Sequence, residues 1–346
     1  MLTYNTIVVL VGAALLGAFA GVVGSFAVLR RRALLGDAMA HAALPGIALG
    51  FWITHSKSVP ALLLGALATG LVGIWALAVM RRHTRTKEDA ALGIVLSVLF
   101  GAGVALSRHV STSVTDGSSA GLDTYILGKT AGIVLSDVVL IGVVAAIALV
   151  VVAMYYKQFR LVGFDTEFAQ SLGWNTVALD FLVMSLVTAA VVAGLPMVGV
   201  VMVAALTILP GVAARLWTDS LAKVLWIAAV FGVIGSTSGV LLSAQYSKLP
   251  TGPIVILCMA ALFLVSGLFA PNRGFVAQLW RRQSFALERG SLILLRLLQE
   301  GNRESDLKKM GVRFPSLTQW YAAKQGWIGA EGLTTQGRAH LEEAQC

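Results

Sequence analysis

An aspartate and a histidine lie four residues apart in a long apolar stretch of this sequence. They are Asp37 and His41, between Arg32 and His55. An ionised carboxylate near the centre of a bilayer costs about 2.5–3.5 kcal/mol, and residues four apart share one face of a helix. A carboxylate oxygen beside an imidazole nitrogen suits Mn²⁺, Zn²⁺ or Fe²⁺. The pair therefore predicts a site that holds a small divalent cation in transit.

The same pair permits other interpretations. Asp37 follows three arginines closely, so its carboxylate would also serve as a helix cap, with His41 hydrogen-bonded to a neighbouring helix. In a secondary transporter driven by an ion gradient, Asp37 would carry a proton. A third alternative is a metal-responsive membrane sensor that signals through its carboxyl-terminal tail.

The whole chain is too apolar for a soluble domain. Of its 346 residues 57% are hydrophobic and 12% charged, and the mean hydropathy is +0.82. We expect an all-α polytopic membrane protein with about nine transmembrane helices. The predicted spans are residues 5–29, 33–54, 59–80, 90–107, 133–155, 176–194, 197–214, 221–243 and 252–270.

Basic residues predict the orientation, because short cytoplasmic loops are rich in Lys and Arg. The basic residues of one set of alternate loops are only Lys57, Arg108, Lys129 and Lys248. The other set includes the arginine-rich segments 30–32 and 81–87. We therefore expect the amino terminus outside and the carboxyl terminus inside. This bias accounts for most of the net charge of +9, so a nucleic-acid partner is not expected.

The sequence predicts a transport subunit rather than an enzyme. It has no Gly-rich loop followed by Lys-Ser or Lys-Thr after a strand, so it carries no nucleotide-hydrolysing site of its own. Its two cysteines, Cys258 and Cys346, are predicted in a span and at the cytoplasmic end, so they form neither a disulfide nor a thiolate metal site. No permanently bound cofactor is expected.

Two segments between the spans are distinctive. Residues 108–131 are polar and predicted outside, where His109 and Asp123 are candidates for a ring at the mouth of the pathway. Residues 161–174 are predicted inside and contain a short helix that would dock another protein or lie flat in the lipid headgroups. The residues that define this helix are Phe164, Phe168 and Leu172 on one stripe, Asp165 as amino-terminal cap, Glu167 in the first turn and Gly173 as the stop.

Several motifs occur together in an order that resembles one family. They are residues 30–50, which contain Asp37 and His41, and residues 121–129, 164–173, 203–210 and 249–253. This set is similar to the permease subunits of manganese, zinc and iron ABC importers of the bacterial plasma membrane. It covers about residues 5–270 and defines a transmembrane permease domain, residues 1–275.

The resemblance implies an importer of two permease chains, identical or not, with two cytoplasmic ATPase subunits and an extracytoplasmic metal-binding protein. It assigns residues 164–173 as the coupling helix that contacts the ATPase. It places Asp37 and His41 in the translocation pathway, facing the same pair of the second chain. The residue types do not discriminate manganese from zinc or iron.

The tail, residues 284–346, is charged and forms a small cytoplasmic domain in our interpretation. Helices are predicted at 292–298, 303–310 and 316–325, followed by a strand or turn and a last helix after Gly332. Residues 333–343 and the preceding helices resemble the winged-helix domain of metal-dependent repressors. The charges of the tail are too balanced for a DNA-binding surface, so a regulatory or assembly module that contacts the ATPase is favoured over DNA binding after proteolytic release.

Overall fold

The computed structural model describes residues 4–32, 34–56, 58–113, 128, 132–246, 249–299, 312, 315–329 and 332–343. The chain divides into two compact units, Met1–Gly267 and Leu268–Cys346. The predicted outer segment 108–131 therefore falls largely outside the described residues, and Asp123 lies there.

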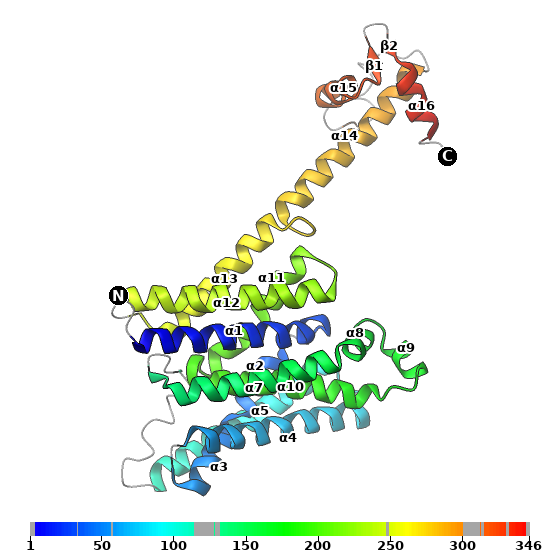
Figure 1. Cartoon of the computed structure of the whole chain (residues 1–346). Helices are drawn as coiled ribbons and strands as arrows, with labels where there is room; N and C mark the ends of the chain where they lie inside the picture. The colour runs from blue at the N-terminus through cyan, green and yellow to red at the C-terminus, as the bar shows by residue number, and fades with distance from the viewer. Residues whose placement is uncertain are drawn as a thin grey trace. The chain divides into compact units, whose positions relative to one another are not determined.

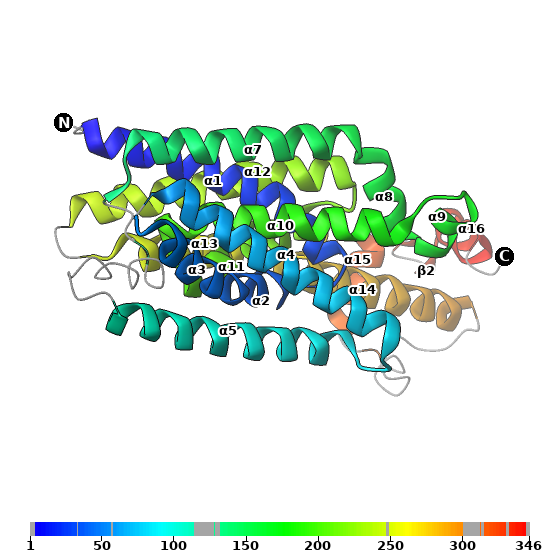
Figure 2. The same cartoon turned by 90° about the horizontal axis from the view of Figure 1, so that it is seen from below.

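The first unit is a bundle of long helices that run side by side (Figures 1 and 2). In chain order its elements, up to the last span, are α1 (Tyr4–Leu29), α2 (Leu34–Ala42), α3 (Leu44–Thr54), α4 (Val59–His83), α5 (Glu88–Ser113), α7 (Leu135–Met154), α8 (Tyr156–Phe164), α9 (Thr166–Ser171), α10 (Thr176–Val198), α11 (Val200–Trp217), α12 (Leu221–Gln245) and α13 (Thr251–Phe269).

The expectation of a polytopic all-α membrane protein is confirmed. Within the described residues, eight helices are long and apolar enough to cross a membrane, with α2 and α3 forming one of them. The span predicted at 197–214 corresponds to α11, whose apolar part is shorter, and its crossing stays a prediction. Helix α10 ends at Val198 rather than at residue 194, with Pro196 in its last turn, and Gly199 follows with φ of 85°.

Helix α1 is the centre of the bundle and packs against α7, α10, α11 and α12. Its glycines allow this close approach. A Cβ atom at Gly17 would collide with the carbonyl oxygen of Gly232, and one at Gly24 would collide with the carbonyl of Thr207. Lipid supplies no hydrophobic drive between helices, so association depends on such backbone contacts.

Five charged side chains link α4, α5 and α10 to the connection between α1 and α2 at one end of the bundle. The Arg32 Nη1 atom donates to both carboxylate oxygens of Asp180 at 2.8 Å, and its Nε atom pairs with Glu88. Arg30 and Arg81 contact the same Asp180 carboxylate at 3.2 and 3.1 Å. Burial lowers the pKa of the Arg30 guanidinium, and the Asp180 carboxylate opposes that change. We call this group the arginine cluster. It brings two of the predicted inner loops together.

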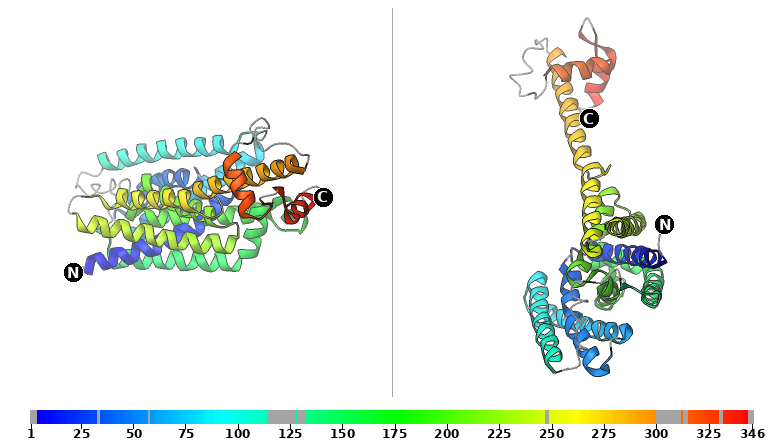
Figure 3. Two further views of the ribbon diagram at one scale, coloured as in Figure 1. Left: turned by 90° about the horizontal axis from the view of Figure 1, so that it is seen from above. Right: turned by 90° about the vertical axis from the view of Figure 1, so that its left-hand side faces the viewer.

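The second unit contains α14 (Phe275–Gln299), α15 (Pro315–Lys324), β1 (Ile328–Gly329), β2 (Gly332–Leu333) and α16 (Thr335–Glu343). Figure 3 shows these elements in two further views. The strands pair antiparallel, with Ile328 opposite Leu333. Leu294, Leu297 and Ala322 form the small core, and the Trp327 ring stacks on His340 at 4.1 Å.

Two helices were predicted in the first part of the tail, at 292–298 and 303–310. The helix predicted at 292–298 is much longer, because α14 already begins at Phe275. The helix predicted at 303–310 lies outside the described residues. The order of helix, helix, hairpin and helix fits a winged-helix arrangement, which stays a prediction.

Substitution of Gly24 tests the close packing of α1. Gly24→Leu should destabilise the protein by about 1–3 kcal/mol or more, because the side chain has no space beside Thr207. The matched control is Gly93→Leu, because a Cβ atom at Gly93 meets nothing within 4 Å. Thermal unfolding in detergent measures both, and equal stability of the two variants would contradict this account of the packing.

Candidate functional site

Asp37 and His41 lie on one face of α2, as their spacing predicts. The His41 Nε2 atom is 3.6 Å from the Asp37 Oδ1 atom, too far for a hydrogen bond. Two donors about 2.1 Å from one tetrahedral ion are themselves about 3.4 Å apart. In the single chain, the Asp37 side chain is 40% exposed and the His41 side chain is 20% exposed. Both donor atoms can therefore reach one ion with little rearrangement.

The immediate surroundings argue against a purely structural role for the pair. Helix α2 begins at Leu34, so Asp37 lies inside the helix rather than at its capping position. The His41 Nδ1 atom is buried and has no hydrogen-bond partner among the described residues. The His41 ring instead meets the edge of Phe100 on α5, with ring centroids 4.8 Å apart. Neither the capping role nor the helix-bridging role is seen.

A break in the helix follows the pair directly. Helix α2 ends at Ala42, and α3 restarts at Leu44 with Pro45 in its first turn. Pro45 has no N–H to donate to the carbonyl group of His41, so the regular ladder stops there. Gly103 of α5 packs against Leu44 and Pro45, where a Cβ atom would be crowded. The break therefore places His41 at a fixed discontinuity within the span.

The described residues of one chain offer at most two neighbouring donors to a metal ion. Among the described residues, no group of three or more His, Cys, Asp and Glu side chains is arranged to hold a metal ion. Transition metals in proteins take about four to six ligands. The two donors of Asp37 and His41, partly exposed at the surface of one bundle, are therefore fewer than a bound transition metal needs.

The short helix at the other candidate site has the expected ends. The Asp165 Oδ1 atom accepts a hydrogen bond from the Phe168 N–H at 2.9 Å and caps α9. The helix stops before Gly173, where φ is 82°. Glu167 lies in its first turn. The apolar side chains Phe164, Phe168 and Leu172 are 65%, 52% and 56% exposed, so this protruding stripe is open to a partner.

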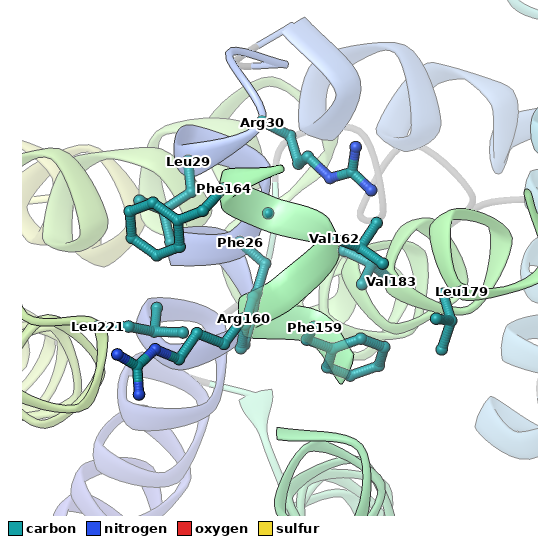
Figure 4. A pocket seen from close by; sticks show the side chains of 11 residues that line it. Phe26, Leu29, Arg30, Phe159, Arg160, Val162, Phe164, Leu179, Val183 and Leu221 are labelled. Carbon is teal, nitrogen blue, oxygen red and sulfur yellow. The ribbon is translucent and has the colours of Figure 1, made fainter. Parts of the chain in front are cut away.

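Helix α8 connects this stripe to the bundle. Its Phe159 ring meets the edge of Phe26 of α1, with centroids 5.5 Å apart. Figure 4 shows the pocket beside this contact, with Phe26 and Phe159 among its lining side chains. Arg30 of the arginine cluster and Phe164 line the same pocket. A displacement of α8 would therefore be transmitted to the end of α1 through this aromatic contact.

Of the two other candidate residues, only His109 belongs to the part of the chain that the structure describes. His109 was expected in a loop, but α5 continues to Ser113, so His109 is helical and exposed, near the ring of Trp52 at 6.4 Å. Asp123 lies outside the described residues. The arginine cluster was not predicted at all, because its partners are 148 and 99 residues apart along the chain. Only the lone acid Asp180, within an otherwise apolar span, was a signal for it.

This chain is similar in sequence to a known family of membrane transport proteins. Residues 3–270 match the ABC 3 transport family. The manganese transport system membrane protein MntC of Bacillus subtilis (strain 168) is 43% identical over 274 residues, which are 79% of this chain and 63% of that protein. The zinc transport system membrane protein TroC of Treponema pallidum (strain Nichols) is 42% identical over 279 residues, or 81% and 93% of the two chains.

A solved structure agrees. PsaBC from Streptococcus pneumoniae, in complex with Fab, superposes with a TM-score of 0.69 at 27% identity and covers 78% of this chain and 94% of that chain. The family match ends at residue 270, so α14 and the elements that follow it are outside the match. The chain is therefore a multi-pass protein of the bacterial plasma membrane and belongs to the ABC 3 transport family.

Proposed function

We propose that this chain is the membrane permease of an ABC importer that carries a divalent transition metal, manganese, zinc or iron, into the cytoplasm. The observation that supports it most is the Asp37 and His41 pair, whose donor atoms are 3.6 Å apart on a half-exposed helix face within a span. Relatives named for manganese and zinc transport agree with these oxygen and nitrogen donors. The metal is the transported substrate, and the chain itself catalyses no covalent chemistry.

The incomplete ligand set favours a dimer of permease chains. A second chain with the same pair would add two donors and give two carboxylates and two imidazoles around one ion. The partial exposure of Asp37 in the single chain leaves room for that arrangement. Two cytoplasmic ATPase subunits and an extracytoplasmic metal-binding protein complete the proposed importer, with the amino terminus outside. The winged-helix-like tail is assigned as a regulatory or assembly module rather than a nucleic-acid binder.

The coupling route that we propose begins at the exposed stripe of α9. From α9 the chain passes through Gly173 directly into α10, and Asp180 lies in the second turn of α10. Asp180 holds Arg32, and Arg32 immediately precedes α2. Movement imposed on α9 by an ATPase would therefore reach the helix that carries Asp37 through one charged, bidentate contact.

Neutralising the pair tests the metal site. Asp37→Asn and His41→Gln should each lower metal uptake by at least about tenfold, because the loss of one ligand removes more than about 1.4 kcal/mol of binding. Uptake of radioactive manganese and zinc by cells with the full transporter measures this. The matched control is His55→Gln, since His55 lies at the end of α3 outside the pair.

Assembly and energy source must be checked in the same cells. The Asp37 and His41 variants should still assemble with the ATPase subunits, and these complexes should still bind ATP. Normal uptake in both variants would refute the metal site. Uptake that survives ATP depletion but collapses with a protonophore would instead indicate an ion-coupled secondary transporter.

The α9 stripe has its own test. Phe168→Asp should abolish co-purification with the ATPase subunits, because it places a charge in the centre of an apolar contact. Gln170→Glu adds a negative charge on the opposite side of the same helix from Phe168 and should leave the complex intact. Equal recovery of the ATPase with both variants would exclude this stripe as the contact.

The route through Asp180 predicts uncoupling. Asp180→Asn removes a partner of Arg32, Arg30 and Arg81, so ATP hydrolysis in the reconstituted transporter should continue while metal uptake per ATP falls severalfold. Asp180→Glu keeps the charge and should retain most of the coupling. An unchanged ratio of uptake to hydrolysis in Asp180→Asn would argue against this route.

A further inference from the structure

The amino-terminal half of α14 has an apolar stripe that is exposed. Phe275, Val276, Leu279 and Trp280 are 58%, 46%, 43% and 78% exposed. The same stripe continues at helical spacing into the carboxyl-terminal half of the helix, where Leu297 is buried in the core of the second unit. The apolar side chains in the carboxyl-terminal half of α14 are therefore accounted for by the core of the second unit. Those in the amino-terminal half have no such contact among the described residues.

Arginines flank this stripe. Arg282 and Arg289 line a shallow hollow with Phe285 and Ala286, and these four positions follow one helix face. The other arginines between residues 271 and 289 are Arg273 and Arg281, and the one acid there is Glu288. An exposed helix that is apolar on one side and basic beside it is typical of helices that lie in a membrane interface.

The chain itself keeps this helix close to a membrane. Helix α13 is one of the helices long and apolar enough to span the bilayer, and it ends at Phe269. Helix α14 begins at Phe275, after a connection of residues 270–274 that can extend at most about 20 Å. The start of α14 therefore lies within about 20 Å of the end of α13.

We propose that residues 275–289 form a membrane-surface helix that binds anionic phospholipids. Phe275, Leu279 and Trp280 enter the boundary between headgroups and acyl chains, which aromatic side chains favour. The Arg282 and Arg289 side chains extend from that boundary toward the water and contact the lipid phosphates. The proposal depends on the membrane placement of α13 and not on the metal or the energy source of transport.

A lipid surface fits this half of α14 better than a protein partner does. Two copies of the helix that met through this face would bring Arg282 and Arg289 of both copies together, and Glu288 alone would oppose them. An anionic bilayer surface offers many negative charges at the distance that the short connection imposes.

The experiment uses the full chain in lipid nanodiscs, with Cys258→Ser and Cys346→Ser as background. Nitroxide labels are attached at Leu279→Cys, in the apolar stripe, and separately at Ser284→Cys, outside it. Collisions with oxygen and with a water-soluble nickel chelate are compared in phosphatidylcholine discs with and without phosphatidylglycerol. The label at 279 should be exposed to oxygen and shielded from nickel when phosphatidylglycerol is present, whereas the label at 284 should remain accessible to nickel.

The arginines are tested with equal changes of charge. In discs with phosphatidylglycerol, Arg282→Gln should reduce the ratio of lipid-exposed to water-exposed label at 279 by about fivefold. Arg281→Gln removes the same charge from another face of the helix and should have a smaller effect. Equal losses in both variants would overturn the assignment of Arg282.

Three other outcomes would overturn the proposal. Nickel access at both labels would show that the helix is solvated. Shielding of the label at 279 from both oxygen and nickel would show that protein covers it, from a second copy or from another part of the chain. Identical behaviour in neutral and anionic discs would remove the role of the phosphates.

Discussion

The energetic cost of a carboxylate in lipid governs the arrangement of this protein. Asp37 and Asp180 are each the one acid of a spanning helix, and their carboxylates have different partners. Asp180 is surrounded by Arg30, Arg32 and Arg81, so its charge is neutralised within the chain. Among the described residues, the side chain that the structure pairs with Asp37 is His41, whose Nε2 atom lies 3.6 Å from the carboxylate. The difference agrees with our proposal, in which Asp180 is a permanent structural charge and Asp37 binds a transported cation.

Much of the fold follows from sequence patterns that act locally. Apolar length predicted the spans, because backbone groups in lipid must be paired within their own helix. The Asp165 cap and the Gly173 stop of α9 were predictable, because capping needs only a few neighbouring residues. The spacing of Asp37 and His41 predicted a shared helix face for the same reason.

The remaining features depend on contacts between distant segments or on weak local signals. The arginine cluster joins residues on α4, α5 and α10 to the connection before α2, and no local pattern identifies such partners. The early start of α14 at Phe275 was missed because its arginines interrupt the apolar sequence, although Phe275 and Leu279 already have helical spacing. Helix α5 extends beyond Arg108 because charged side chains at the end of a span can reach water while the backbone stays helical.

A site divided between two chains suits a carrier better than a complete site in one. Four strong ligands in a single chain would hold a transition metal too tightly for rapid release, as structural zinc sites do. In the proposed dimer, with two donors on each chain, the ligand set would exist only while the two α2 helices face each other, so a small change in their separation would change the coordination number. The Pro45 break beside His41 and the Arg32 anchor before α2 hold the two ends of this short helix. Movement at the arginine cluster would thereby reposition the ligands as a rigid pair and open the site without unfolding any helix.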